Sequence, residues 1–251
     1  MLLSGCRTAL PYATPGRYDR GLVIVLPGIH GRIGLTDAIC HGLNDGGVDG
    51  AIEIYDWTSW RGPIYNLEAQ AGNRKVAKKI AQRIVKYQKE RPLRPVVLLG
   101  HSGGAALAAW ASEEMPMGHN VDGVVLLAAA MSPGYDLDLA LAGSRRGIVS
   151  FHCDRDWFFL GVGTFVAGTM DGRHTASAGR TGFTVPQALR RERGYDRLFQ
   201  VAWRDEMAEA GHIGSHLTSG ARAYVARYVA PWVRQATWDE ALLRRAGDAR
   251  P

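Results

Sequence analysis

A series of short, continuous apolar runs constrains the fold of this chain more than any other feature. The runs occupy residues 22–26, 51–57, 96–99, 124–130, 148–152 and 198–203. Strands have this pattern when helices cover both faces of a parallel sheet, because neither face then meets water. Between the runs, residues 73–90, 103–114 and 221–235 carry apolar side chains at helical spacing. This alternation predicts a doubly wound α/β sheet with right-handed crossovers.

The length and composition favour one large domain. The chain has 251 residues, of which 46% are hydrophobic and 22% charged, and this balance excludes a disordered chain. We expect a single domain at 19–240, after an N-terminal tether or signal remnant at 1–18 and before a polar tail at 241–251. Within the domain, the Gly- and Thr-rich residues 157–185 interrupt the α/β alternation. This stretch is predicted to form a long loop or modest lid.

Charge and cysteine content exclude several classes of partner. The net charge is +6, but the Lys and Arg residues are scattered without an aromatic-studded basic stripe, so no nucleic-acid partner is expected. The three cysteines, Cys6, Cys40 and Cys153, include no CxxC pair, which argues against a disulfide framework and a zinc site. No metal or organic cofactor is expected. Cys40 and Cys153 are predicted to pack as small apolar side chains.

The N-terminus allows two interpretations of localisation. Leu3-Ser4-Gly5-Cys6 resembles a bacterial lipobox, in which the cysteine is lipidated. The basic and apolar regions of an export signal do not precede it in this sequence. The chain as written is expected to be cytoplasmic. If the true start lies upstream, Cys6 would attach an exported lipoprotein to a membrane.

The segment 96–106, VVLLGHSGGAA, places a G-x-S-x-G motif between a strand and a helix. This context predicts a sharp turn from which the Ser102 hydroxyl projects at the carboxyl edge of the sheet. Gly100 and Gly104 keep the turn uncrowded. The N–H of Gly103, at the start of the helix, can then donate to a substrate oxygen. The alternative interpretation is a plain glycine-rich turn with a helix-capping serine.

These residues resemble α/β-hydrolase-fold serine hydrolases over nearly the whole chain. LPGIHGR, EIYDWT, GHSGGAAL and LGVGTFVAGTMDGRHTASAGRTGF are similar to segments of poorly characterised bacterial hydrolase- and lipase-like proteins. The resemblance implies an α/β-hydrolase fold without a large cap domain. It also implies a second oxyanion donor after an early strand, here the N–H of Ile29, with Gly28 allowing close approach of the backbone. Pro27 stands where the family commonly has histidine.

The family's order of nucleophile, acid and histidine implies a base late in the chain. His212 is the first candidate because Gly-His-x-Gly precedes the last long helix, and His216 is the alternate. His101 occupies a variable position of the motif and is not expected to be the base. The acid should follow the strand at 148–152 and orient the imidazole. The candidates, in order of preference, are Asp156, Asp154, and Asp136 or Asp138 after the preceding strand.

Together these residues predict a serine hydrolase that cleaves a carboxylic ester through an acyl-enzyme. Its partner would be a small-molecule acyl substrate. His30 and Trp57 are expected near the pocket, although core packing is an equal alternative for Trp57 and Trp60. The same triad would serve a thioesterase, an amidase or peptidase, or an acyltransferase. A third interpretation is a non-catalytic, tethered binding protein that retains the fold.

Overall fold

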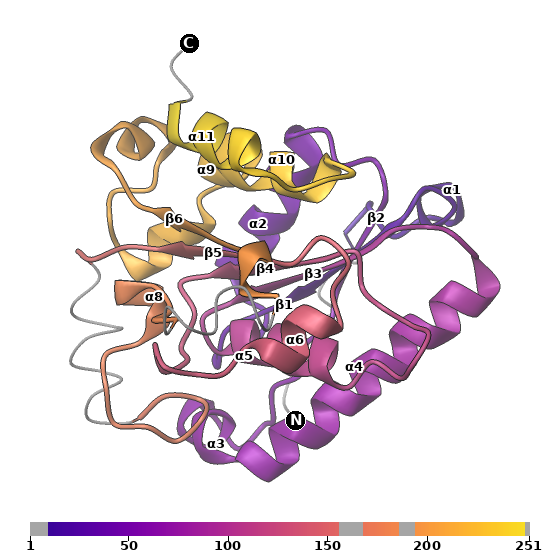
Figure 1. Cartoon of the computed structure of the whole chain (residues 1–251), viewed down its shortest axis with the longest axis horizontal. Coiled ribbons are helices and arrows are strands. Elements are labelled where there is room, and N and C mark those ends of the chain that lie inside the picture. The colour runs from indigo at the N-terminus through magenta and orange to yellow at the C-terminus, as the bar shows by residue number, and fades with distance from the viewer. Residues whose placement is uncertain (1–9, 156–167, 186–193, 249–251) are drawn as a thin grey trace, which may run out of the picture.

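The computed structural model describes residues 10–155, 168–185 and 194–248. Within them, one sheet has the strand order β2-β1-β3-β4-β5-β6 (Figure 1), and each neighbouring pair is parallel. The strands are β1 (Leu22–Leu26), β2 (Ala51–Ile54), β3 (Val96–His101), β4 (Gly123–Leu127), β5 (Ile148–His152) and β6 (Leu198–Ala202). The predicted parallel sheet is therefore confirmed.

Helices cover both faces of the sheet, as the continuous apolar runs predict. One face packs against α4 (Gln70–Glu90), α5 (Gly103–Glu113) and α6 (Asp138–Ala142). The other packs against α2 (Gly34–Asp45), α9 (Arg222–Tyr224), α10 (Ala230–Arg234) and α11 (Glu240–Asp248). Shorter elements are α1 (Pro15–Tyr18), α3 (Pro63–Glu68), α8 (Ala178–Thr181), η3 (Tyr195–Arg197), η4 (Asp205–Ala210) and η5 (His216–Gly220). No helix in the described part of the chain is both long and apolar enough to cross a membrane.

The C-terminal helix differs from the prediction. Instead of one helix over 221–235, the chain forms α9, a π-helical turn η6 (Val225–Val229) and α10. Pro231 has no N–H, and its ring would clash with the carbonyl of Arg227 in a regular helix. The wider π turn accommodates this proline, so the interruption has a local cause.

Two strands end three residues before their apolar runs do. β2 ends at Ile54 rather than at Trp57, and β4 ends at Leu127 rather than at Ala130. Ala128 has a positive φ of 47°, which turns the chain out of the sheet immediately after β4. The remaining apolar residues of both runs therefore belong to loops at the carboxyl edge of the sheet.

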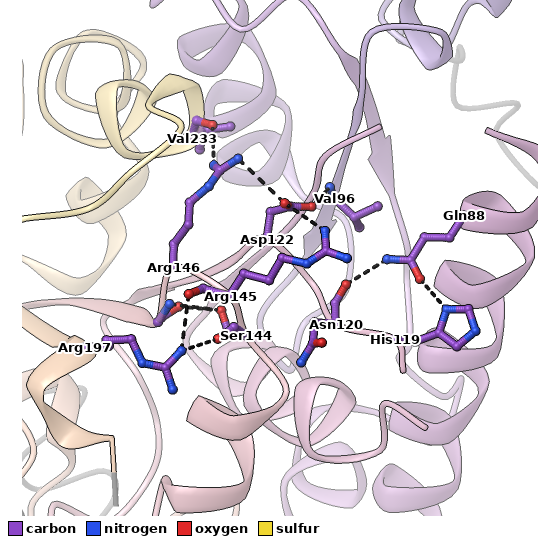
Figure 2. Close-up of polar contacts among 11 residues, drawn as sticks. Gln88, Val96, His119, Asn120, Asp122, Ser144, Arg145, Arg146, Arg197 and Val233 are labelled. Atoms are coloured by element: carbon purple, nitrogen blue, oxygen red, sulfur yellow. Dashed lines mark hydrogen bonds and ion pairs between the residues drawn. The ribbon is translucent and has the colours of Figure 1, made fainter. Parts of the chain in front are cut away.

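A set of polar contacts joins the opposite edge of the sheet (Figure 2). The Asp122 carboxylate accepts the N–H of Val96 at 2.7 Å and lies 3.2 Å from Nη1 of Arg145. Arg146 donates to the carbonyl of Val233 at 3.4 Å. Arg197 donates to the carbonyl of Ser144 at 2.7 Å. These seven residues link the amino-terminal ends of β3, β4, β5 and β6 to α10, and we call them the amino-edge network.

Candidate active site

Ser102 lies on a strained turn between β3 and α5. Its backbone has φ 55° and ψ −119°, a conformation that is costly for a residue with a Cβ. The turn is fixed because the Ser102 N–H donates to Leu127 at 2.9 Å, and its carbonyl accepts the N–H of Ala130 at 3.1 Å. Although Ser102 is the N-cap residue of α5, its side chain makes no capping hydrogen bond. The contacts therefore do not support the capping-serine interpretation.

The two outer glycines of the motif permit this turn. A Cβ at Gly100 would lie 2.2 Å from the carbonyl oxygen of Gly104. A Cβ at Gly104 would lie 2.2 Å from the carbonyl oxygen of Leu26, at the end of β1. Atoms cannot approach this closely, so both positions need glycine for α5 to start against the sheet.

The two expected oxyanion donors lie side by side. A Cβ at Gly103 would be 2.7 Å from Cγ2 of Ile29, and one at Gly28 would be 3.4 Å from Cβ of Ser102. In the described part of the chain, the N–H groups of Ile29 and Gly103 have no hydrogen-bond acceptor. Asn66 donates to the carbonyl of Ile29 at 2.8 Å and so holds its backbone. Two unused donors are thus fixed next to Ser102.

Apolar side chains line the space beside Gly103. Its Cβ position is 3.3 Å from Sδ of Met170 and 3.4 Å from Cζ2 of Trp57. The Trp57 indole also donates to the carbonyl of Pro27 at 2.7 Å, so Trp57 both packs in the fold and borders the site. Trp60, by contrast, is 93% exposed, which corrects the alternative that it packs in the core. His30 is also exposed.

Met170 was not predicted from the sequence. It is fully buried, and its N–H donates to the carbonyl of Ala130 at 2.9 Å. Ala178 and Gly179 of α8 donate to the carbonyls of Met131 and Ala129, at 2.7 and 2.8 Å. The described half of the expected loop or lid therefore lies against the carboxyl ends of the strands.

The sequence analysis did not identify the contacts of His101, a buried residue directly before Ser102. Its Nε2 lies 3.1 Å from Oγ of Ser219, whose hydroxyl donates to the carbonyl of His216 at 2.7 Å. The Nε2–H of His101 is therefore the donor to Ser219. Burial, with the nearby charges of His216 and His212, lowers the pKa of His101 to about 3. His101 stays neutral and joins the serine turn to η5.

The two candidate bases have different surroundings. The His216 ring lies 4.9 Å from that of His101, the residue directly before Ser102. The His212 ring packs 4.6 Å from that of Tyr224, and its Nδ1 is 3.0 Å from Oγ1 of Thr218. Both histidines are buried. The Ser102 hydroxyl is hydrogen-bonded to neither of them, which is common before substrate binds.

The preferred acid, Asp156, lies outside the described residues, as do Cys6 and residues 157–167. Asp154 is exposed and lies in a cavity with Arg180 and Trp203. Asp136 accepts the hydroxyl of Tyr195 at 2.7 Å and the N–H of Asp138 at 3.0 Å. These bonds fix the loop before α6.

The remaining titratable groups show no metal centre. No group of three or more His, Cys, Asp or Glu residues within the described ranges is arranged to hold a metal ion. Cys40 packs in the apolar core, as predicted, and Cys153 is also buried, with its thiol 3.4 Å from the carbonyl of Gly214. Burial raises the pKa of the Cys40 thiol to about 12, so this thiol remains protonated.

No family model and no curated protein matches the chain. Solved structures are similar to it at low sequence identity. A poly(3-hydroxybutyrate) depolymerase from Bordetella parapertussis is 17% identical, with 93% of this chain and 86% of that chain covered and a TM-score of 0.47. An esterase domain from Rhodothermus marinus is 16% identical, with coverage of 85% and 86% and a TM-score of 0.45. A protein from Thermus thermophilus is 18% identical, with coverage of 92% and 90% and a TM-score of 0.47.

These likenesses concern the arrangement of the fold alone. The architecture itself rests on the six-stranded parallel sheet, the helices on both of its faces and the serine turn after β3. The expected doubly wound sheet is confirmed, and the described residues contain no large cap domain. The chain has the α/β-hydrolase fold.

Proposed function

We propose that the chain is a serine hydrolase that cleaves carboxylic esters with Ser102 as nucleophile. One observation carries this proposal. Ser102 lies on a strained turn and its side chain makes no capping hydrogen bond, and next to it are two backbone N–H groups that have no acceptor in the described structure. Preorganised donors of this kind stabilise the oxyanion of acyl transfer. Strain in the Ser102 backbone fits a functional role, because strained backbone conformations cluster at active sites.

The reaction would proceed through an acyl-enzyme. Ser102 Oγ attacks the ester carbonyl while the base takes its proton, and the N–H groups of Ile29 and Gly103 hold the oxyanion. The C–O bond to the leaving alcohol then breaks, and the alcohol receives the proton from the base. Water attacks the acyl-enzyme by the same route and releases the acid. Trp57 and Met170 give the acyl group an apolar surface.

We propose His216 as the base, and its contacts support it over His212. The His216 ring packs on that of His101, which directly precedes Ser102 in the sequence. The Nδ1 of His212, by contrast, is hydrogen-bonded to Thr218. A catalytic histidine needs this nitrogen for the acid, which stabilises the imidazolium. Asp156 remains the proposed acid from its place after β5.

Labelling with a fluorophosphonate probe tests the proposal. We expect Ser102→Ala to abolish labelling, because the probe forms its bond with the activated serine. His216→Gln should slow labelling by about 100-fold or more, and His212→Gln should have a much smaller effect. Ser112→Ala, which changes a buried serine of the same helix, should label like the wild type.

Continued labelling of Ser102→Ala would overturn the proposal, as would an unlabelled wild type that is correctly folded. A loss with His212→Gln in place of His216→Gln would reassign the base while leaving Ser102 as nucleophile. Turnover of matched esters, thioesters and amides then tests the leaving group. An ester preference is expected, and a preference for either of the others would contradict the ester assignment.

A further inference from the structure

A cavity of about 380 Å³ opens at the carboxyl ends of β5 and β6. The described residues that line it are His152, Asp154, Arg180, Thr181, Ala202 and Trp203. Such a volume is in the range of small-molecule sites. β5 and β6 are the second and third strands from β3, so the cavity lies about 10–15 Å from Ser102 along the same edge.

Two opposite charges face this cavity without pairing. Arg180 and Asp154 both line it, yet within the described residues no nitrogen of Arg180 lies within ion-pair distance of the Asp154 carboxylate or any other. The contact that Arg180 makes with this residue is a long one of 3.5 Å from Nε to the backbone carbonyl of Asp154. Unpaired charges on one cavity wall favour a ligand that carries a complementary charge for each.

Trp203 gives the cavity a fixed aromatic surface. The Trp203 indole donates to the carbonyl of His212 at 2.6 Å, and the Arg155 guanidinium covers its ring at 4.5 Å. These contacts leave the indole as a rigid surface. Burial lowers the pKa of His152, so this residue adds no positive charge. Among the described residues of the wall, Arg180 and Asp154 then carry the charge.

We propose that the cavity binds a zwitterionic amino-acid group. Its carboxylate would lie at Arg180, its ammonium group at Asp154, and its side chain against Trp203. Binding itself does not need Ser102. The consequence that an ester substrate carries an amino-acid or peptide-like end does rest on the proposed function.

Direct binding measurements on Ser102→Ala protein test the cavity without turnover. The probes are L-phenylalanine, N-acetyl-L-phenylalanine, L-phenylalaninamide and N-acetyl-L-phenylalaninamide, which carry both charges, the negative one, the positive one and neither. Calorimetry should find L-phenylalanine the tightest ligand. Each deleted charge should weaken binding by roughly tenfold, as expected for a charge-assisted hydrogen bond.

Two substitutions in the same background assign each charge to its wall residue. Arg180→Gln should remove the advantage of a carboxylate and leave that of the ammonium group, and Asp154→Asn should do the reverse. Arg173→Gln changes an exposed cation of the same segment that does not line the cavity, and should change nothing. Equal binding of all four probes, no binding at millimolar concentration, or a carboxylate preference that survives Arg180→Gln would overturn the inference.

Fluorophosphonate labelling of the Arg180→Gln protein with Ser102 intact separates this inference from the proposed function. If the protein with Ser102 intact is labelled but its Ser102→Ala form binds none of the amino-acid probes, the cavity proposal is rejected and the hydrolase proposal is kept. Charge-dependent binding to a protein that takes no label would keep the cavity and reject the hydrolase.

Discussion

At the scale of single residues, backbone atoms make the serine turn possible. Gly104 lies where α5 begins against the end of β1, and any side chain there would meet the carbonyl oxygens of Leu26 and Pro27. Such a contact cannot be relieved by rotating a side chain, because the obstructing atoms belong to the main chain. The turn therefore requires glycine at position 104.

We expect Gly104→Ala to lower the free energy of unfolding by about 3 kcal/mol or more, or to prevent folding. Gly72→Ala is the matched control, since Gly72 is an exposed helical glycine whose nearest neighbour would be 3.9 Å from the new Cβ. It should stabilise the protein by about 0.5–1 kcal/mol. Urea unfolding of both variants measures the difference, and equal midpoints would contradict the steric argument.

A second prediction concerns His101 and pH. Its folded pKa is lowered to about 3, below the ordinary value of about 6.5 in the unfolded chain. The unfolded state therefore binds the extra proton, so the contribution of neutral His101 is complete above the unfolded pKa and is lost as pH falls toward 3. In this window the dependence approaches about 1.4 kcal/mol per pH unit.

His101→Gln keeps a donor for Ser219 and removes the titration. Between pH 7 and pH 5, the free energy of unfolding should fall by more in the wild type than in this variant. If both proteins lose the same amount of stability, His101 is not buried as a neutral side chain.

At the scale of elements, the amino-edge network joins strands far from Ser102. Asp122→Ala would leave the N–H of Val96 without its acceptor and the half-buried Arg146 without a carboxylate. We expect a loss of about 2–4 kcal/mol in unfolding free energy, with unchanged probe labelling of the folded protein.

Asp49→Ala removes an exposed ion pair with Arg20 near the same edge and should cost at most about 1 kcal/mol. The comparison of the two variants by urea unfolding separates the network from surface charge in general. Equal losses would show that the Asp122 contacts are no more than an exposed pair.

The sequence predicts strands better than it predicts where the chain leaves them. β1 and β5 have the predicted bounds because their apolar runs end where the strands end. β4 is cut short at Ala128, whose backbone conformation is set by contacts with other strands. Helix α2 was not predicted, since glycine weakens helical propensity at Gly42, and only the packing of α2 on the backbone of Arg222 explains that glycine.

In the candidate site too, the sequence predicts some features and not others. Ser102 and Gly103 follow from the strand–turn–helix motif, which dictates its own backbone geometry, and Ile29 follows from the family resemblance. The choice between His212 and His216 depends on which ring faces His101, and the approach of Met170 depends on a distant loop. Neither can be predicted from the spacing of residues in the local sequence.

At the scale of the whole molecule, two separate cores lie on the two faces of one sheet. Ile80 belongs to one and Ile39 to the other, and both are buried. Each Ile→Val change should cost about 0.5–1.5 kcal/mol. The double variant should equal the sum within about 0.5 kcal/mol, because the two residues belong to separate clusters. Urea unfolding of the three variants measures this, and a larger deviation would mean that the sheet transmits packing strain between its faces.

The separation of the amino-edge network from the serine turn also bears on how this protein can change. Loops at the carboxyl edge could acquire new substrate specificities while the starts of the strands stay clamped. A mutation that weakens the fold near Ser102 could be compensated at the opposite edge without disturbing the chemistry. Directed evolution of this scaffold should therefore begin by strengthening the amino edge and only then diversify the loops.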